Sequence, residues 1–205
     1  MATERTVYVL DDDDAALRSL ERLLSSANFQ PITFNRPDVF LKAARAFNTG
    51  CVLLDVHLPG ISGLEVQEQL HMMRNDLPVI VMTGEGDIHT AVRAMKAGAA
   101  DFLEKPYSDQ ALLGAIRAAF ANERPPDRNS DIEDAIRRVA VLTPREREVL
   151  DGLLAGKPNK LIAYHLGISV RTVEVHRARM MERLGLRQLA EAIRLGVMAG
   201  LGRKG

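Results

Sequence analysis

Short apolar runs alternate with amphipathic segments over the first 121 residues of the chain. The runs TVYVL, PITF, CVLLD, PVIVM and DFLE have the length and β-branched content of buried strands. Between them, the segments at about 15–27, 37–47, 63–73, 87–97 and 108–121 repeat apolar residues at helical spacing. Five such strand–helix units predict an α/β fold, a five-stranded doubly wound parallel sheet with helices on both faces.

The pattern changes after this first region. Pro125 and Pro126 end the preceding helix, and the polar residues that follow indicate a linker. The linker is either a helix or a coil, because Ile132, Ile136 and Val139 are spaced for one helical face.

From Leu142 onward the strand pattern is absent, and four helical segments are separated by breaks near residues 156–158, 167 and 185. These segments predict a small all-α domain. We therefore expect a domain over residues 1–122, a linker over 123–140 and a second domain over 141–205.

Charge separates the two predicted domains, although the whole chain carries 27 basic and 27 acidic residues. Residues 1–122 have 11 basic and 16 acidic side chains, a net charge of −5, whereas residues 141–205 have 12 and 6, a net charge of +6. A basic helical domain is a candidate for nucleic-acid binding.

Composition excludes several classes of protein. No apolar run reaches the ~18 residues of a membrane span, and the N-terminus lacks the apolar core of a signal peptide, so we expect a cytoplasmic protein without a membrane partner. The lone cysteine, Cys51, cannot form an internal disulfide and lies in an apolar run.

Polar residues gather at the predicted carboxyl ends of the strands. Asp11 and Asp12 follow the first strand, Asp55 ends the third, and Thr83 and Lys105 follow the fourth and fifth. In a doubly wound sheet these ends meet at one edge, where ligands bind. The expected site therefore combines three carboxylates, a hydroxyl and an ammonium.

This combination favours capture of a phosphoryl group. Hard carboxylate oxygens select Mg²⁺, and an aspartate can act as nucleophile to form an aspartyl phosphate. Mg²⁺ and Lys105 would neutralise the phosphoryl oxygens, and the Thr83 hydroxyl could bond one of them. Of the remaining acidic residues, we expect Asp14 to cap the following helix, while Asp13 has no required task beyond adding to the negative field.

Sequence motifs in this region resemble those of the receiver domain of bacterial two-component response regulators. They are the aspartate pair after the first strand, D-x-x-x-P-x-x-S-G from Asp55, T-G at Thr83, and A-M-K-A-G-A-A-D-F-L-E-K-P ending at Pro106. The resemblance covers roughly residues 4–122 and implies a flavodoxin-like receiver fold.

By that resemblance, Asp55 accepts the phosphoryl group and binds Mg²⁺ together with Asp12, Asp11 and the main-chain carbonyl of His57. The resemblance also implies that Thr83 and Phe102 form a switch pair and that Lys105 is the family's lysine.

Phosphorylation is expected to repack the surface beyond the switch pair. Thr83 would move toward the phosphoryl group, and the ring of Phe102 would occupy the space that it leaves. Val92 and Lys96 lie four residues apart on the predicted fourth helix, and we expect this face to dimerise on phosphorylation.

The stretch NKLIAYHLGISVRTVEVHRARMMERL indicates two helices joined by a turn, with Ser169 as N-cap of the second. Val173, Met180 and Leu184 form its inward stripe. The residues that we expect to contact DNA are Lys160, Arg171, Thr172, Glu174, Val175, His176, Ala178 and Arg179. A helix of this kind fits the major groove, and Lys160 suits a phosphate. His176 is either a phosphate donor or a packed residue.

The segment from Leu142, L-T-P-R-E-R-E-V-L, together with P-N-K, L-x-I-S and R-T-V-E-V-H-R, resembles the LuxR-type helix-turn-helix over about residues 140–200. With the receiver motifs, the whole chain resembles the FixJ-type transcriptional regulators. The resemblance implies a sensor histidine kinase, promoter DNA and RNA polymerase as partners, homodimerisation on phosphorylation, and regulation of transcription, with activation favoured.

Two other functions compete with this interpretation. One is a regulator that binds DNA independently of phosphorylation. The other is a Mg²⁺-dependent phosphohydrolase, which would use a second aspartate two residues after the nucleophile, where this chain has His57. We expect no enzymatic activity beyond the phosphotransfer and dephosphorylation of the chain itself.

Overall fold

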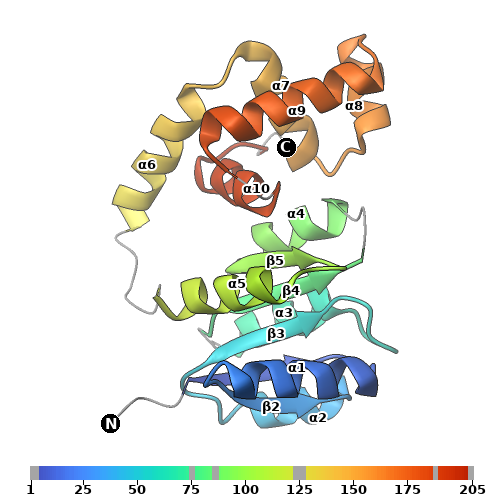
Figure 1. Ribbon diagram of the computed structural model, residues 1–205, viewed down its shortest axis with the longest axis vertical. Coiled ribbons are helices and arrows are strands. Elements are labelled where there is room, and N and C mark those ends of the chain that lie inside the picture. Colours follow the sequence, from blue (N-terminus) through green and yellow to red (C-terminus); the bar gives the residue numbers. More distant parts are fainter. Residues whose placement is uncertain (1–4, 74–76, 85–87, 122–127, 187–188, 203–205) are drawn as a thin grey trace. The chain divides into compact units, whose positions relative to one another are not determined.

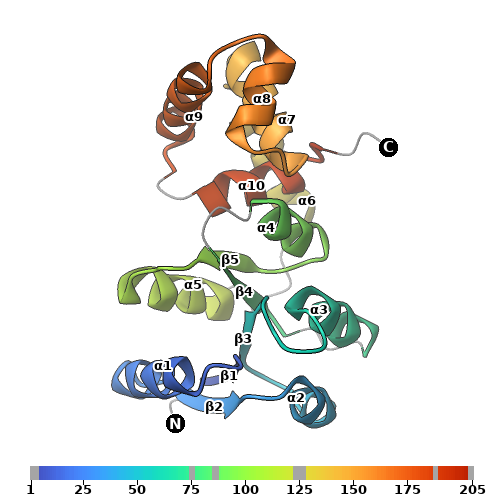
Figure 2. The ribbon, with the colours of Figure 1, turned by 90° about the vertical axis from the view of Figure 1, so that its right-hand side faces the viewer.

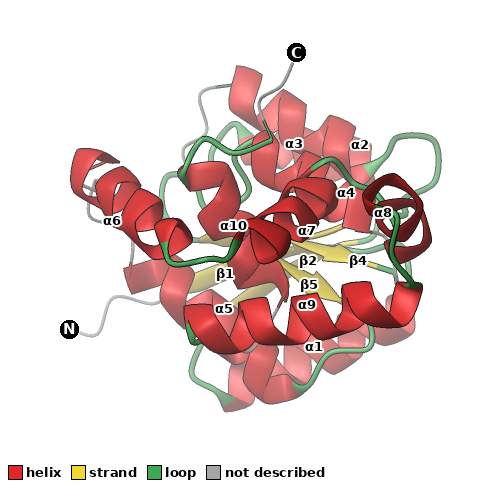
Figure 3. Cartoon of the chain, turned by 90° about the horizontal axis from the view of Figure 1, so that it is seen from above, coloured by secondary structure: helices red, strands yellow, loops and turns green. Residues whose placement is uncertain are grey.

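The computed structural model describes residues 5–73, 77–84, 88–121, 128–186 and 189–202 (Figure 1). The chain divides into two compact units. The first comprises Met1–Gly86 and Ala97–Arg124, and the second comprises Asp87–Lys96 and Pro125–Gly205. The strands lie in the first unit, whereas the described residues of the second unit form helices and their connections (Figure 3).

The sheet of the first unit has the predicted strands and is parallel throughout. Its strands are β1 (Thr6–Leu10), β2 (Gln30–Phe34), β3 (Cys51–Asp55), β4 (Val79–Thr83) and β5 (Asp101–Glu104). Their order across the sheet is β2-β1-β3-β4-β5, which places the reversal of strand order between β1 and β3. The predicted α/β class is confirmed.

Helices α1 (Asp14–Ser26) and α5 (Asp109–Ala121) cover one face of the sheet, and α2 (Pro37–Ala44) and α3 (Gly63–Met72) cover the other (Figure 2). The face under α1 and α5 carries a continuous core that includes Val9, Leu20, Leu53, Leu112 and Ile116. β3 and β4 are buried along their whole length, as expected of central strands covered on both faces. Helix α4 (Ile88–Lys96) follows β4 in sequence.

The N-cap of α1 corrects a prediction from the sequence. Asp13, not Asp14, is the cap, with extended backbone angles (φ −84°, ψ 105°), and its carboxylate accepts from the N–H groups of Ala15 and Ala16. Asp14 is the first helical residue, and its carboxylate accepts from the Asn35 side-chain amide at 3.1 Å. The helix begins at Asp14, one residue earlier than predicted, so Asp13 caps it in place of Asp14.

Besides α4, the described part of the second unit contains the four helices predicted after residue 142 and one more before them. The latter is α6 (Arg128–Ala140), so the described part of the predicted linker is a helix. The other four are α7 (Pro144–Leu154), α8 (Asn159–Leu166), α9 (Val170–Leu184) and α10 (Leu189–Met198). The predicted boundary at residues 122 and 123 lies outside the described residues.

The buried face of α6 contains only one of the three residues that share the predicted face, Val139. Ala135 and Val139 are buried, whereas Ile132 and Ile136 are about half exposed. The small side chain of Ala135 lets α6 approach α10, which it contacts, and this contact decides which face is buried.

The capping assignment predicts unequal effects of two aspartate substitutions on stability. Asp13→Ala should lower the free energy of unfolding by about 1 kcal/mol, because two amides at the start of α1 lose their acceptor. Asp14→Ala should have the smaller effect, since its contact with Asn35 is exposed. Urea denaturation of both variants checks this, and a larger loss for Asp14→Ala would contradict the assignment.

Candidate functional site: an acidic strand edge and a basic helix

The strand order brings the predicted acidic residues together. β1 and β3 are neighbours, so Asp11, just beyond β1, lies beside Asp55, the last residue of β3. Carboxylate oxygens of Asp11, Asp12 and Asp55 lie within 4.8 Å of one another. Asp11 and Asp55 are buried and Asp12 is exposed. This set of hard oxygen donors at the mouth of the sheet fits a divalent cation.

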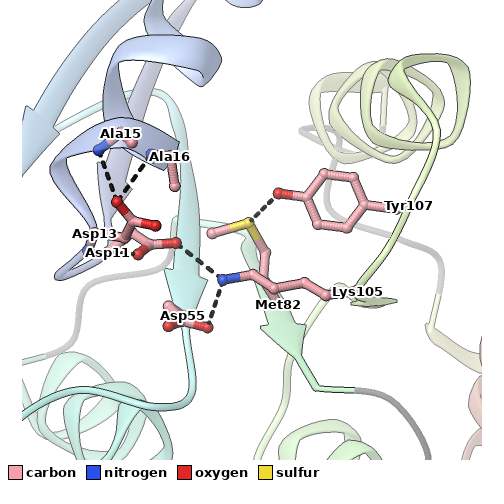
Figure 4. Close-up of polar contacts among 8 residues, drawn as sticks. All are labelled: Asp11, Asp13, Ala15, Ala16, Asp55, Met82, Lys105 and Tyr107. Carbon is pink, nitrogen blue, oxygen red and sulfur yellow. Dashed lines mark hydrogen bonds and ion pairs between the residues drawn. The ribbon is translucent and has the colours of Figure 1, made fainter.

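Lys105 supplies positive charge to the two buried carboxylates. Its ammonium lies 3.0 Å from Asp11 Oδ2 and 3.1 Å from Asp55 Oδ1 (Figure 4). The other oxygen of Asp11 accepts from the Asp13 N–H at 2.9 Å, so the turn after β1 orients that carboxylate. Lys105 follows β5, and its N–H donates to the Thr83 carbonyl at 2.8 Å. The site therefore depends on residues from β1, β3, β4 and β5.

Burial dominates the ionisation of the central carboxyl. It raises the pKa of Asp55 above its ordinary value; the Lys105 ammonium lowers that pKa but does not cancel the effect, and the Asp11 charge adds to it. Burial also lowers the pKa of Lys105, yet its two carboxylate partners outweigh burial, so the pKa of Lys105 is raised. The single positive charge of Lys105 therefore does not offset the negative charges of Asp11 and Asp55.

Thr83 lies at the end of β4 with its side chain 1% exposed. Its hydroxyl oxygen has no hydrogen-bond partner among the described residues. A buried hydroxyl without a partner is costly, and such a group in a native structure calls for an explanation. A ligand oxygen bound at this strand edge would satisfy it.

The other predicted residues of this region are placed as follows. Phe102 is buried in β5, and His57 is exposed in the loop after β3. In α4, Val92 is buried, whereas Lys96 is exposed and donates to the Gly202 carbonyl at 3.4 Å. The predicted dimer face stays a prediction.

Tyr107 was not singled out from the sequence. Its hydroxyl contacts the Met82 sulfur at 3.2 Å, and burial raises the pKa of Tyr107 (Figure 4). The contact joins the segment after β5 to the end of β4, next to Thr83. Tyr107 and Met82 are 25 residues apart, and no sequence spacing predicts their contact.

The helix-turn-helix of the second unit consists of α8 and α9, joined through Gly167 in the left-handed conformation (φ 65°). Ser169 is the N-cap of α9, as predicted, and accepts from the Thr172 N–H at 3.1 Å. Val173, Met180 and Leu184 are buried, which confirms the inward stripe. The predicted DNA-contacting residues Lys160, Arg171, Glu174, Val175, Ala178 and Arg179 are exposed.

Two predicted DNA contacts are less accessible. Thr172 and His176 are partly buried, and the Thr172 hydroxyl lies 2.8 Å from the Ser169 hydroxyl. Arg177 is also partly buried, and it donates to Asn159 Oδ1 at 3.0 Å, which joins α9 to the first residue of α8. Arg177 therefore holds the two helices together.

The buried Glu146 joins the end of α9 to the start of α7. Sequence spacing indicates only one of its two contacts. Thr143 and Glu146 form a capping box, as the T-x-x-E spacing could have indicated. Glu146 also accepts from Arg183 at 2.9 Å, 37 residues away. Burial raises the pKa of Glu146, but hydrogen bonds from Thr143 and Arg183 outweigh burial and leave that pKa below its usual range.

None of the described helices is both long enough and apolar enough to cross a membrane.

Two family models match the chain. The model for the response regulator receiver domain matches residues 7–117, and that for bacterial regulatory proteins of the luxR family matches residues 140–196. The receiver match contains Asp11, Asp55, Thr83 and Lys105, and the second match contains the helix-turn-helix. Neither model describes an enzyme family.

Similar proteins match over nearly the whole chain. The transcriptional regulatory protein FixJ of Bradyrhizobium diazoefficiens is 43% identical, with 98% of each chain covered. FixJ of Azorhizobium caulinodans is 45% identical, covering 95% of this chain and 93% of the relative. The crystal structure of full-length FixJ from B. japonicum is 42% identical, with a TM-score of 0.59, and the match covers 97% of this chain and 98% of that one.

The acidic strand edge, the basic helix-turn-helix and these matches across both units lead to one conclusion. The chain belongs to the FixJ-like two-component response regulators, which join a receiver domain to a LuxR-type DNA-binding domain and regulate transcription.

Proposed function

We propose that Asp55 is the phosphoacceptor of this response regulator and that its phosphorylation controls DNA binding by α9. The observation that carries the proposal is the Lys105 ammonium held 3.0–3.1 Å from the carboxylates of Asp11 and Asp55. Lys105 would meet a developing phosphoryl charge at the point where Asp55 attacks.

The phosphoryl donor is the phosphohistidine of a sensor kinase. A carboxylate oxygen of Asp55 attacks the phosphorus, the new P–O bond forms, and the P–N bond breaks with its electron pair leaving on the imidazole. The Lys105 ammonium neutralises one transferred oxygen, and the Thr83 hydroxyl donates to another, which gives that buried hydroxyl its partner.

The cation that this site would hold is Mg²⁺, with Asp11, Asp12, Asp55 and the main-chain carbonyl of His57 as its ligands. Three carboxylates within 4.8 Å suit a hard divalent ion, which when bound neutralises negative charge on the site and on the phosphoryl oxygens. Asp12 is the exposed member of this set, and Asp11 also pairs with Lys105.

The response reaches DNA through a homodimer. Movement of Thr83 and Phe102 alters the surface around Val92 and Lys96, and the dimer presents two copies of α9 to half-sites about 34 Å apart. Double-stranded promoter DNA and RNA polymerase are the resulting partners. The exposed Arg171, Glu174, Val175 and Ala178 face bases, and Lys160 and Arg179 face phosphates.

Phosphorylation and its effect on DNA binding can be tested together. Acetyl phosphate with Mg²⁺ should label the wild-type chain and raise its affinity for a duplex that it selects from a random-sequence pool, whereas Asp55→Asn should lose both responses. Asp14→Asn is the matched control, because Asp14 is exposed and outside the carboxylate cluster, and it should behave as wild type. Labelling by mass spectrometry and affinity by gel shift check this; full enhancement of DNA binding in Asp55→Asn would overturn the proposal.

The raised pKa of Asp55 makes a separate prediction about stability without Mg²⁺. A carboxyl whose pKa is raised by folding contributes stability below its unfolded pKa of about 4 and loses it as the pH rises through the folded value. Asp55→Asn should therefore be more stable than wild type at pH 7, and the difference should shrink as the pH falls toward about 4. Urea unfolding in the presence of a chelator measures it, and a destabilised variant at pH 7 would contradict the assignment. Added Mg²⁺ should stabilise wild type more than the variant.

Salt dependence separates phosphate contacts from base contacts. Lys160→Gln should make the plot of log affinity against log salt shallower by about 0.9 and leave sequence preference unchanged. Lys42→Gln removes the same charge from an exposed position in α2 and should leave the slope unchanged. An unchanged slope in Lys160→Gln, measured by fluorescence anisotropy, would remove Lys160 from the interface.

A further inference from the structure

The C-terminal end of α9 is a junction of three helices of the second unit. Arg138 of α6 donates through Nη2 to the main-chain carbonyl of Leu184, the last residue of α9, at 3.1 Å. One residue earlier, Arg183 donates through Nε to Glu146 of α7 at 2.9 Å and through Nη2 to its other oxygen at 3.4 Å. Two side-chain anchors from different helices therefore hold the same end of α9.

The Arg138 contact is of a kind that fixes a helix end. The last carbonyls of a helix lack intrahelical donors, and a cation at this end is also favoured by the helix dipole. The backbone N–H of Gly185 donates to the Glu182 carbonyl, and that of Leu186 donates to the Met181 carbonyl. Neither bond uses the Leu184 carbonyl, which accepts from the Arg138 guanidinium. Arg138 is partly buried, which restricts the orientations of its side chain.

Helix α6 itself is firmly placed within the unit. Ala135 and Val139 are 1% and 2% exposed, and α6 contacts α10. Arg138 directly precedes Val139, two residues before α6 ends at Ala140. Because α6 is packed in this way, the hydrogen bond from Arg138 to Leu184 fixes the end of α9 relative to α6.

We propose that Arg138 is a positioning residue for the recognition helix, so that α6 is part of the DNA-reading apparatus and not a passive tether. The inference rests on the proposed DNA-binding role of α9. Because Arg138 bonds the far end of α9 from Ser169, it sets the direction of the helix axis, on which the reach of Arg171, Glu174 and Val175 to base edges depends. A small tilt of α9 should affect phosphate contacts less than base contacts, because hydrogen bonds to base edges require a more exact position of the side chain.

The test uses the full chain, treated with acetyl phosphate and Mg²⁺, and compares two DNA probes. One probe is a duplex that the wild-type chain selects from a random-sequence pool, and the other is unselected duplex of the same length. Arg138→Gln should lower affinity for the selected duplex by roughly fivefold or more and leave affinity for unselected DNA near wild type. Arg138→Lys, which retains a cation able to reach the carbonyl, should restore most of the loss.

The matched control lies next in the chain. Arg137 is exposed and pairs with Glu133 and Asp134 on α6 itself, so Arg137→Gln removes the same charge without touching α9. It should leave both affinities unchanged. A thermal melt of each variant identifies loss of fold, which would lower binding to both probes together.

The outcomes separate this inference from the proposed function. If the wild-type chain shows no gain in affinity with acetyl phosphate, or no preference for a selected duplex, the proposed function fails. If wild type shows both and Arg138→Gln keeps the wild-type ratio of selected to unselected affinity, the positioning role of Arg138 is wrong. A parallel fall on both probes also contradicts it, because that result indicates a purely structural role.

Discussion

The ammonium of Lys105 between two buried carboxylates is the interaction on which the arrangement of the acidic site depends. Asp11 and Asp55 are buried at neighbouring strand ends, and each carboxylate there would cost several kcal/mol if it had no partner. Lys105 follows β5 and reaches both carboxylates across β4, so their charge is partly offset only when β1, β3, β4 and β5 are all paired. The geometry of the site therefore depends on the pairing of these four strands.

The same electrostatics explains why the site favours binding of a cation and of an anionic oxygen group. Burial and Asp11 keep the pKa of Asp55 raised in spite of Lys105, and the Thr83 hydroxyl is buried without a partner among the described residues. A site that is short of positive charge and of one acceptor offers binding energy to a cation and to an anionic oxygen group together. A divalent cation would supply the missing positive charge, and the oxygens of the phosphoryl group proposed for Asp55 would supply the missing acceptor.

Sequence patterns were sufficient for the strands, the strand-end residues and the inward stripe of α9, because each follows from a short period or a strand terminus. They failed where two adjacent choices were chemically equal. Asp13 and Asp14 are equally good caps by residue type, and only the backbone angles at Asp13 distinguish them. For α6, spacing placed Ile132 and Ile136 on one face with Val139, but in contact with α10 it is Ala135 that is buried beside Val139. Long-range pairs such as Arg183 with Glu146 have no spacing to detect.

The recognition helix shows how such pairs limit what can read DNA. Its start is fixed by the Ser169 cap, which also occupies the Thr172 hydroxyl, and Arg177 is engaged with Asn159. Its end is fixed by Arg138 and by Glu146 through Arg183. Arg171, Glu174 and Arg179 are exposed on α9, and they are the polar side chains of this helix that we propose for contact with DNA. A helix held at both ends presents these groups at fixed spacing, and this rigidity is what allows a base sequence to be distinguished by geometry instead of by charge alone.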